Sequence, residues 1–212
     1  MNVRSLKKLH FLIASGPTRE PLDPVRFISN YSTGVMGKYL AQAAKKRGHA
    51  VQWVQCPQDA QTALELHKKL GALLRTSDVL IMAAAVCDVR PAELRASKIK
   101  KDDLKNISFV KNPDILAELS KKKKKNQIFI GFGLESQNLF KNGAEKLRKK
   151  GLELIVLQKV RKNQTPFGDK SIEAFLLYKD KDKPLRRFGQ IHKKKLAEYL
   201  IREAERLDTC KN

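Results

Sequence analysis

The sequence contains few cysteines and no long apolar run. Its 212 residues include only three cysteines, Cys56, Cys87 and Cys210, which lie far apart and form no C-x-x-C pair. This odd, scattered set argues against a disulfide framework and against a zinc site. No apolar run approaches the roughly 18–20 residues of a membrane helix, and residues 1–8 do not form a secretory signal. We therefore expect a cytoplasmic protein with no membrane association.

Several catalytic signatures are also missing. The sequence has no GxxxxGK[ST] phosphate loop, and Gly131-Phe132-Gly133 lacks the third glycine and the acidic partner of a dinucleotide fingerprint. It has neither an HExxH nor a GxSxG motif. The four histidines are scattered along the chain and read as surface or strand-end residues: His10, His49, His67 and His192. Metalloenzyme and covalent-nucleophile mechanisms therefore have little support.

Acidic residues are scarce relative to basic ones. The chain has 44 Lys and Arg against 22 Asp and Glu, a formal net charge of +22. Such an excess can bind nucleic acid by counterion release. The lysines are spread over the whole chain, however, and we find no zinc-finger spacing, RNP-like aromatic set or helix-turn-helix. A basic nucleic-acid-binding protein of Rossmann-like fold stays open as the alternative function, and a flavin- or NAD-binding oxidoreductase is a third.

Strand and helix patterns alternate along the chain. A hydrophobic content of 42% is enough for a substantial core, and no linker divides the sequence. We expect strands at Leu9–Ala14, Ala50–Val54, Val79–Val86, Gln127–Phe132, Leu154–Leu157 and Ile172–Tyr178, and helices at Val35–Arg47, Gln61–Leu70, Pro113–Ser120, Glu135–Lys150 and Ile191–Leu207. This order predicts a single α/β domain over residues 1–212, with three Rossmann-like layers and a mostly parallel sheet. Residues 92–110 are expected to form a flap or hairpin, and the late strand alternates enough to run antiparallel.

The connection from Gly16 to Gly37 is unusually long. Strand-to-helix loops in α/β units usually have about 2–6 residues, and longer ones are often binding loops. This one is polar and leads through Asn30, Ser32 and Gly34 into a helix start, where backbone N–H groups favour an anion. The alternative is an ordinary surface loop before a capped helix.

Further polar clusters follow later strands. These are Asp88 with Arg90, Lys98 to Lys101, Asn112 to Asp114, and Phe132 with Lys146 and Lys150. In open α/β sheets, ligands bind at the carboxyl ends of the strands. The distribution therefore suits a nucleotide that spans several loops, with a second anionic substrate at the first loop. Taken one at a time, Asp88 is equally a turn or cap residue, and Lys146 and Lys150 are more often helix-surface charges.

Five segments together carry a family resemblance. In order and spacing, GPTREPLDPVRFISNYSTGVMG, AAAVCDVRP, SKIKK, VKNPDILAEL, and IGF followed by KLRKKGLELIV resemble the phosphopantothenate–cysteine ligases of coenzyme A biosynthesis. The resemblance covers Leu9 to about Phe175 and is to the bacterial, CTP-dependent type. Nothing in the sequence matches the flavin-dependent decarboxylase that often precedes this ligase, so we expect a stand-alone enzyme.

The resemblance implies a reaction and a set of partners. Cysteine would be joined to 4′-phosphopantothenate through an acyl-cytidylate, with release of pyrophosphate and CMP. CTP rather than ATP would be the co-substrate, Mg²⁺ the metal, and a homodimer the assembly. By the same resemblance, Lys98 is the catalytic lysine on a mobile flap, and Asn30 and Arg26 handle the acyl intermediate.

The resemblance also implies which residues bind the ligands. The expected nucleotide-binding residues are Ala84, Ala85, Asp88, Lys98, Pro113, Asp114, Ile115, Leu116, Phe132, Lys146 and Lys150; the expected substrate-binding residues are Gly16, Asn30, Ser32, Gly34 and Gly37. The metal ligands stay unassigned. This chain departs from the family pattern at Val35, where a lysine is usual between the two glycines, and at Cys87 and Val89, which flank the aspartate.

Overall fold

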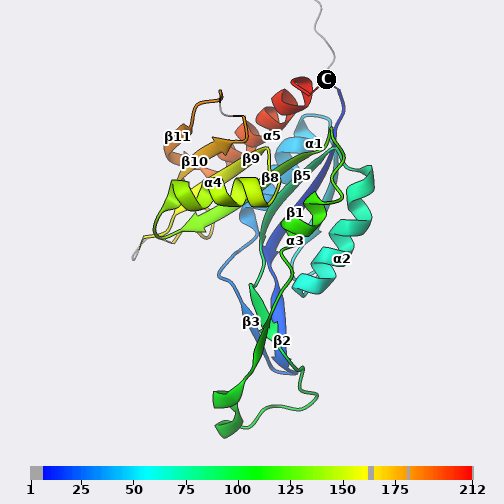
Figure 1. Ribbon diagram of the computed structural model, residues 1–212, viewed down its shortest axis with the longest axis vertical. Helices are drawn as coiled ribbons and strands as arrows, with labels where there is room; N and C mark the ends of the chain where they lie inside the picture. Colours follow the sequence, from blue (N-terminus) through cyan, green and yellow to red (C-terminus); the bar gives the residue numbers. More distant parts are fainter. Residues whose placement is uncertain (1–6, 162–164, 181, 212) are drawn as a thin grey trace, which may run out of the picture.

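The central sheet has seven strands in the order β11-β10-β9-β8-β5-β1-β4 (Figure 1). The computed structural model describes residues 7–161, 165–180 and 182–211. Five of these strands run parallel to their neighbours: β1 (His10–Pro17), β4 (Ala50–Gln55), β5 (Val79–Ala85), β8 (Ile128–Glu135) and β9 (Leu154–Lys159). At one edge, β10 (Ser171–Tyr178) and β11 (Arg186–His192) run antiparallel. The predicted mostly parallel sheet and antiparallel late strand are both confirmed.

Helices cover both faces of this sheet. On one face α1 (Val35–Lys46) and α5 (Lys193–Thr209) pack over a shared apolar cluster. On the other face lie α2 (Ala63–Leu73), which the 3₁₀ turn η1 (Leu74–Thr76) extends, α3 (Ile115–Ser120) and α4 (Leu139–Lys149). The inner parallel strands β1, β5, β8 and β9 are mostly buried on both faces, as expected for a sheet between two helical layers, whereas the edge strand β4 is only partly buried. The predicted three-layer, Rossmann-like α/β fold is confirmed.

The strand order reverses between β1 and β5. From β1 the chain passes through α1 to β4, then returns through α2 to β5 on the other side of β1. The chain that follows β1 leads to α1 on one face of the sheet, and the chain that follows β5 leads to a helix on the other face. In doubly wound sheets, ligands bind in the crevice that this reversal opens at the carboxyl ends of the strands.

An arm projects from the carboxyl end of the sheet (Figure 1). It consists of the hairpin β2 (Arg19–Asp23) and β3 (Arg26–Ser29), together with β6 (Val89–Pro91), the 3₁₀ turn η2 (Asp102–Asn106) and β7 (Phe109–Lys111). The expected flap, residues 92–110, lies in this arm. The prediction of one long loop from Gly16 to Gly37 is wrong, because much of that stretch pairs as strands. These strands pair outside the main sheet, so they carry no buried apolar run that would mark them in the sequence.

Several element boundaries also differ from the predictions. The helix expected from Pro113 begins at Ile115, because the Asp114 side chain accepts a hydrogen bond from the Ala117 N–H and caps it. The helix expected from Glu135 begins at Leu139, because β8 continues to Glu135 in register with β9. The edge strand β11 was not predicted, since it is mostly exposed and lacks apolar alternation. It displaces the start of the last helix from Ile191 to Lys193.

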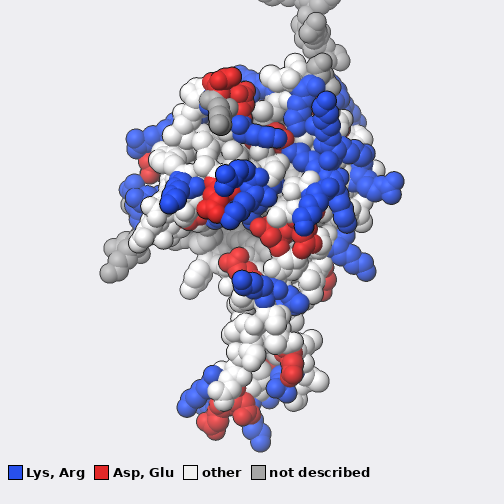
Figure 2. Space-filling model, in the orientation of Figure 1, with Lys and Arg blue, Asp and Glu red and all other residues white. Residues whose placement is uncertain are grey.

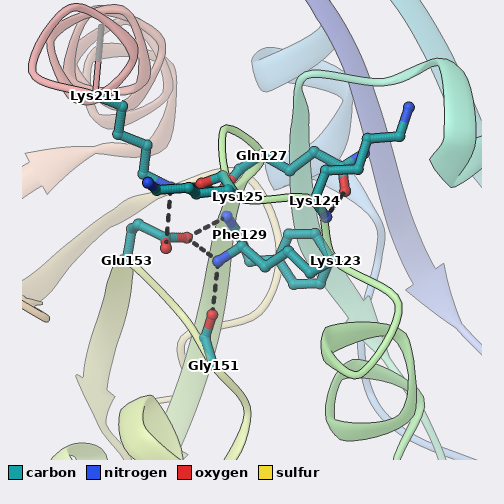
Figure 3. A network of polar contacts seen from close by, with 8 residues as sticks. All are labelled: Lys123, Lys124, Lys125, Gln127, Phe129, Gly151, Glu153 and Lys211. Atoms are coloured by element: carbon teal, nitrogen blue, oxygen red, sulfur yellow. Dashed lines mark hydrogen bonds and ion pairs between the residues drawn. The ribbon is translucent and has the colours of Figure 1, made fainter.

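An ion cluster around the buried Glu153 carboxylate joins segments at the amino-terminal end of the sheet (Figure 3). The Glu153 carboxylate accepts a hydrogen bond from the Phe129 N–H at 2.7 Å. It also pairs with Lys123 and, at 3.2 Å, with Lys211 beyond α5. Burial lowers the pKa of the Lys123 ammonium, while its bond to Glu153 opposes that shift. The cluster lies at the opposite end of the strands from the arm.

Among the described residues, no helix is both long and apolar enough to cross a membrane.

Candidate active site

A cavity of about 420 Å³ opens at the carboxyl ends of β1, β5 and β8. It lies where the strand order reverses. Its lining combines polar loop residues and apolar strand ends: Asn30, Ser32, Thr33, Gly34, Val35, Met36, Met82 to Asp88, Asn112 to Leu116, Phe132, Leu134, Lys146, Lys150, Gln158, Pro166, Phe167 and Lys193. The structure thus brings together thirteen of the predicted ligand-binding residues: Asn30, Ser32, Gly34, Ala84, Ala85, Asp88, Pro113, Asp114, Ile115, Leu116, Phe132, Lys146 and Lys150.

One side of the cavity is formed by the entry to α1. Gly34 is the N-cap residue of α1, with a left-handed φ of 72°, and no side chain caps the helix. The first-turn N–H groups of α1 therefore remain available to an anion. Nearby, the Asn30 amide donates to the Ala85 carbonyl at 3.1 Å and lies 3.9 Å from the Cys87 sulfur. This contact holds the Asn30 side chain against the end of β5.

Two predicted substrate glycines, Gly16 and Gly37, do not line the cavity. A Cβ on Gly16 would lie 2.1 Å from the Cys56 carbonyl oxygen, and its φ of +83° also disfavours a side chain. A Cβ on Gly37 would meet the Ser15 side chain at 2.1 Å. Gly16 lets the backbone that follows β4 approach the end of β1 closely, and Gly37 lets α1 approach β1. Their direct role in substrate binding stays a prediction.

Asp88 and Cys87 follow the end of β5. Cys87 is buried, and burial raises the pKa of its thiol, with a hydrogen bond toward Thr18 opposing the shift. A neutral, buried thiol suits packing better than nucleophilic attack. Asp88 is exposed to the cavity. Its backbone carbonyl accepts from the Asn112 N–H, which joins this loop to the segment before α3.

The two predicted nucleotide lysines are already ion-paired. The Lys146 ammonium lies 2.5 Å from Glu135, and the Lys150 ammonium lies 3.0 Å from Asp114. Burial tends to raise the pKa of Glu135, but hydrogen bonds from Lys146 and Asn142 lower it overall. Both lysines line the cavity while they are paired with these carboxylates.

The predicted catalytic residues Arg26 and Lys98 lie on the arm, outside the cavity lining. The Arg26 guanidinium pairs with Asp23 at 2.7 Å and donates to the Ile99 carbonyl at 3.1 Å. Lys98 is exposed, next to that anchored residue. The structure therefore places Arg26 near the Lys98 segment but does not bring either residue to Asn30. Their catalytic roles stay predictions.

Sequence reasoning missed Lys193, the first residue of α5. It lines the cavity, and its ammonium donates to the carbonyls of Pro166 and Gly168, both at 2.6 Å. A signal was present, because Lys193 stands three and seven residues before Leu196 and Leu200 on the buried face of α5. Lys193 is followed by Lys194 and Lys195, and this run of three lysines made its position on the buried face hard to recognise.

Basic side chains are distributed widely. On the face shown in Figure 2 they cover the sheet-and-helix body and reach the tip of the arm, with acidic side chains interspersed. Within the described residues, no group of three or more His, Cys, Asp or Glu could hold a metal ion. On this face the basic side chains do not form the single stripe that is typical of a nucleic-acid-binding groove.

The fold and the site together define a doubly wound α/β domain with a cavity where its strand order reverses. Residues 6–207 match the family model described as the DNA/pantothenate metabolism flavoprotein C-terminal domain, so the chain belongs to this family.

Curated relatives and solved structures agree with this assignment. The coenzyme A biosynthesis bifunctional protein CoaBC of Escherichia coli is 37% identical over 198 residues, covering 86% of this chain and 49% of that protein. The Bacillus subtilis CoaBC is 36% identical over 188 residues, covering 82% and 46%. This chain thus spans about half the length of the curated relatives that it matches.

Among solved structures, the C-terminal domain of a CoaBC has a TM-score of 0.77 at 27% identity, covering 95% of this chain and 96% of that one. A Cab2 variant in complex with phosphopantothenate-cysteine has a TM-score of 0.70 at 15% identity, covering 95% and 88%. At that identity, the second comparison shows a shared fold only.

Proposed function

We propose that this chain is a phosphopantothenate–cysteine ligase that uses CTP. The observation that carries the proposal is that one cavity is lined by two sets of polar groups, which come from helices on opposite faces of the sheet. One set, around Asn30 and Gly34, belongs to the entry of α1. The other, with Lys146 and Lys150, belongs to α4. The family membership supports the same activity, since its relatives include bifunctional coenzyme A biosynthesis proteins.

The proposed reaction has two steps. The carboxylate of 4′-phosphopantothenate attacks the α-phosphorus of CTP, which forms an acyl-cytidylate and releases pyrophosphate. The amine of cysteine then attacks the activated carbonyl, which forms the amide and releases CMP. Lys146 and Lys150 would stabilise charge on the phosphates, and the Asn30 amide would donate to the acyl carbonyl. Asp88 would accept hydrogen bonds from the base or a sugar hydroxyl, because a carboxylate repels phosphate.

Mg²⁺ fits this site as an ion that arrives with the nucleotide. Mg²⁺ is commonly held by one or two carboxylates plus substrate phosphates. Besides Asp88, which we assign to the base or sugar, Asp114 is the carboxylate in the cavity lining, and it is paired with Lys150. One paired carboxylate suits an ion that would be held mainly by the triphosphate, where it would neutralise charge as pyrophosphate leaves.

We extend the proposal to a homodimer formed through the arm. Large apolar side chains are exposed along it: Val25, Phe27, Val89, Leu94, Phe109 and Val110. Exposed apolar clusters of this kind commonly mark protein interfaces. Leu94→Glu should weaken the dimer in sedimentation experiments, whereas Leu64→Glu, at an exposed leucine on α2, should not. A monomeric parent protein would contradict this part of the proposal.

A ligation assay tests the activity. The protein is incubated with 4′-phosphopantothenate, cysteine and Mg²⁺, with CTP and ATP compared side by side, and pyrophosphate and the amide product are measured. We expect product with CTP and little with ATP. Absence of both pyrophosphate and acyl-nucleotide with either nucleotide would refute the ligase. Tight, steeply salt-dependent binding of an oligonucleotide that CTP does not displace would instead support the nucleic-acid alternative.

A further inference from the structure

Lys193 is a buried cation at the edge of the cavity. Only 5% of the residue is exposed. Its ammonium has three N–H groups, and two of them donate to the carbonyls of Pro166 and Gly168. Within the described residues, Lys193 forms no ion pair with a carboxylate. Because an unpaired buried charge is costly, this position favours an anionic partner that is not part of the chain.

The electrostatic surroundings of Lys193 support this view. Burial lowers the pKa of its ammonium to about 8, with the neighbouring Lys170 adding to the shift and Asp169 opposing it. A lysine in an ordinary capping or surface role would keep its charge with little cost. A perturbed group that lines a cavity is instead a candidate for ligand binding.

Lys193 belongs to the α1 side of the cavity. The segment that it holds, residues 166–169, contacts residues on both sides of the start of α1. The Phe167 ring lies 6.3 Å from the ring of Tyr31, and Asp169 accepts a 2.7 Å hydrogen bond from the Tyr39 hydroxyl. The lysines assigned to the nucleotide, in contrast, come from α4 on the opposite face of the sheet.

We propose that Lys193 and the N-terminus of α1 together bind the 4′-phosphate of the acyl substrate. This inference rests on the proposed ligase function and names a residue for one end of its substrate. The reacting carboxylate of that substrate would lie near Asn30, so its phosphate must lie elsewhere in the cavity. The start of α1 offers N–H groups there, but its first residue, Val35, has no charge. Lys193 supplies that charge from α5.

Direct binding measurements test the assignment without requiring turnover. The dissociation constants of 4′-phosphopantothenate, pantothenate and CTP are measured by calorimetry for the parent protein and for Lys193→Gln. We expect Lys193→Gln to weaken 4′-phosphopantothenate about 10- to 100-fold, as for the loss of a charged hydrogen bond. Binding of pantothenate, which lacks the phosphate, and of CTP should change less than about twofold.

Three further variants separate charge from structure. Lys195→Gln removes an exposed lysine of the same helix and should leave all three affinities unchanged. Lys193→Arg retains the charge and should keep most of the preference for the phosphorylated ligand. In the Lys193→Gln background, Val35→Lys should recover part of the lost affinity, because it places a cation at the same helix end.

Two outcomes would overturn the inference. One is an equal loss of 4′-phosphopantothenate and pantothenate binding in Lys193→Gln, which would indicate that Lys193 only holds residues 166–168 in place. The other is no recovery with Val35→Lys, which would place the phosphate away from α1. If the parent protein binds 4′-phosphopantothenate but forms no product with CTP or ATP, the ligase proposal fails while the binding comparison still tests Lys193.

Discussion

Lys98 and Asn30 lie in different parts of the molecule, and we propose that they act in different steps of the reaction. Lys98 is exposed on the arm, whereas Asn30 lines the cavity beside the end of β5. A cation on the arm can stabilise the phosphates as CTP is attacked. An amide at the end of β5 can instead hold the activated acyl group for the amine.

Variants at these two residues should therefore block different steps. Lys98→Gln is expected to slow acyl-cytidylate formation about 10²- to 10³-fold, as when one charge-stabilising donor is lost. Asn30→Asp should still form the intermediate but slow its consumption by cysteine. Single-turnover chromatography with labelled CTP resolves the two species, and Lys105→Gln on the same arm serves as control. Equal suppression of intermediate formation by both variants would contradict this division of roles.

The lowered pKa of Lys193 predicts a pH dependence of substrate binding. A lysine with a pKa of about 8 carries its charge below that pH and loses it above, well before an ordinary lysine. Lys170 lowers this pKa, while Asp169, which also contacts Tyr39 and His192, opposes the shift. We therefore expect 4′-phosphopantothenate to bind up to about tenfold more weakly for each pH unit above about 8. Calorimetry between pH 7 and pH 9.5 measures this, and identical profiles for the parent and Lys193→Arg would refute it.

At the scale of elements, Asp23 fastens the two halves of the arm. Its buried carboxylate accepts from the N–H groups of Val25, Arg26 and Ile99, and it pairs with the Arg26 guanidinium. Burial alone would raise the pKa of Asp23, but these hydrogen bonds and Arg26 lower it overall. The carboxylate thus connects the β2–β3 hairpin to the segment that carries Lys98.

Asp23→Asn should loosen this connection, because an amide offers a single uncharged acceptor oxygen in place of two. We expect the Ile99 N–H to exchange with solvent about tenfold faster, as for the loss of one net hydrogen bond. Amide hydrogen exchange read by mass spectrometry over residues 95–101 measures the effect. Asp102→Asn, at an exposed position on η2, is the matched control. Unchanged exchange in Asp23→Asn would show that the arm is held by other contacts.

At the scale of the whole molecule, Glu153 joins elements that are distant in sequence. It connects β8, the segment after α3, and the chain beyond α5 through Phe129, Lys123 and Lys211 (Figure 3). Substituting Glu153 with Gln leaves the partly buried Lys123 ammonium without its counter-charge. The free energy of unfolding should fall by about 3 kcal/mol, because removing one partner leaves the other charge desolvated and uncompensated.

Urea unfolding of Glu153→Gln and of a matched control measures this loss. Glu145→Gln removes the exposed pair with Lys149 on α4, and it should change stability by less than about 0.5 kcal/mol. Comparable losses in the two variants would show that the ion cluster contributes no more than a surface pair. The cluster lies away from the cavity, so ligand affinities should change little in either variant.

Most elements of the sheet and its helical layers could be predicted from the sequence alone. Continuous apolar runs such as Val79–Val86 indicate strands buried on both faces, and helical spacing marks α1 and α5. The alternation of these elements requires parallel strands, so their carboxyl ends, with Asn30 and Asp88, gather at one edge. Thirteen of the residues that line the cavity were among the ligand-binding residues that the family resemblance implied. Apolar runs and helical spacing are local features of the sequence, so they can be recognised without knowledge of the tertiary structure.

Only the tertiary structure decided the arm and the charge partners. The hairpin β2–β3 pairs outside the main sheet, so no apolar run marks it. The pairs Lys146–Glu135 and Lys150–Asp114 join residues from different elements, and no local pattern specifies them. Lys193 lies in a run of similar lysines, and only the packing of α5 against the sheet buries it beside the cavity. Periodicity determines which elements form, whereas the charge and position of each side chain at the site depend on contacts between residues far apart in the chain.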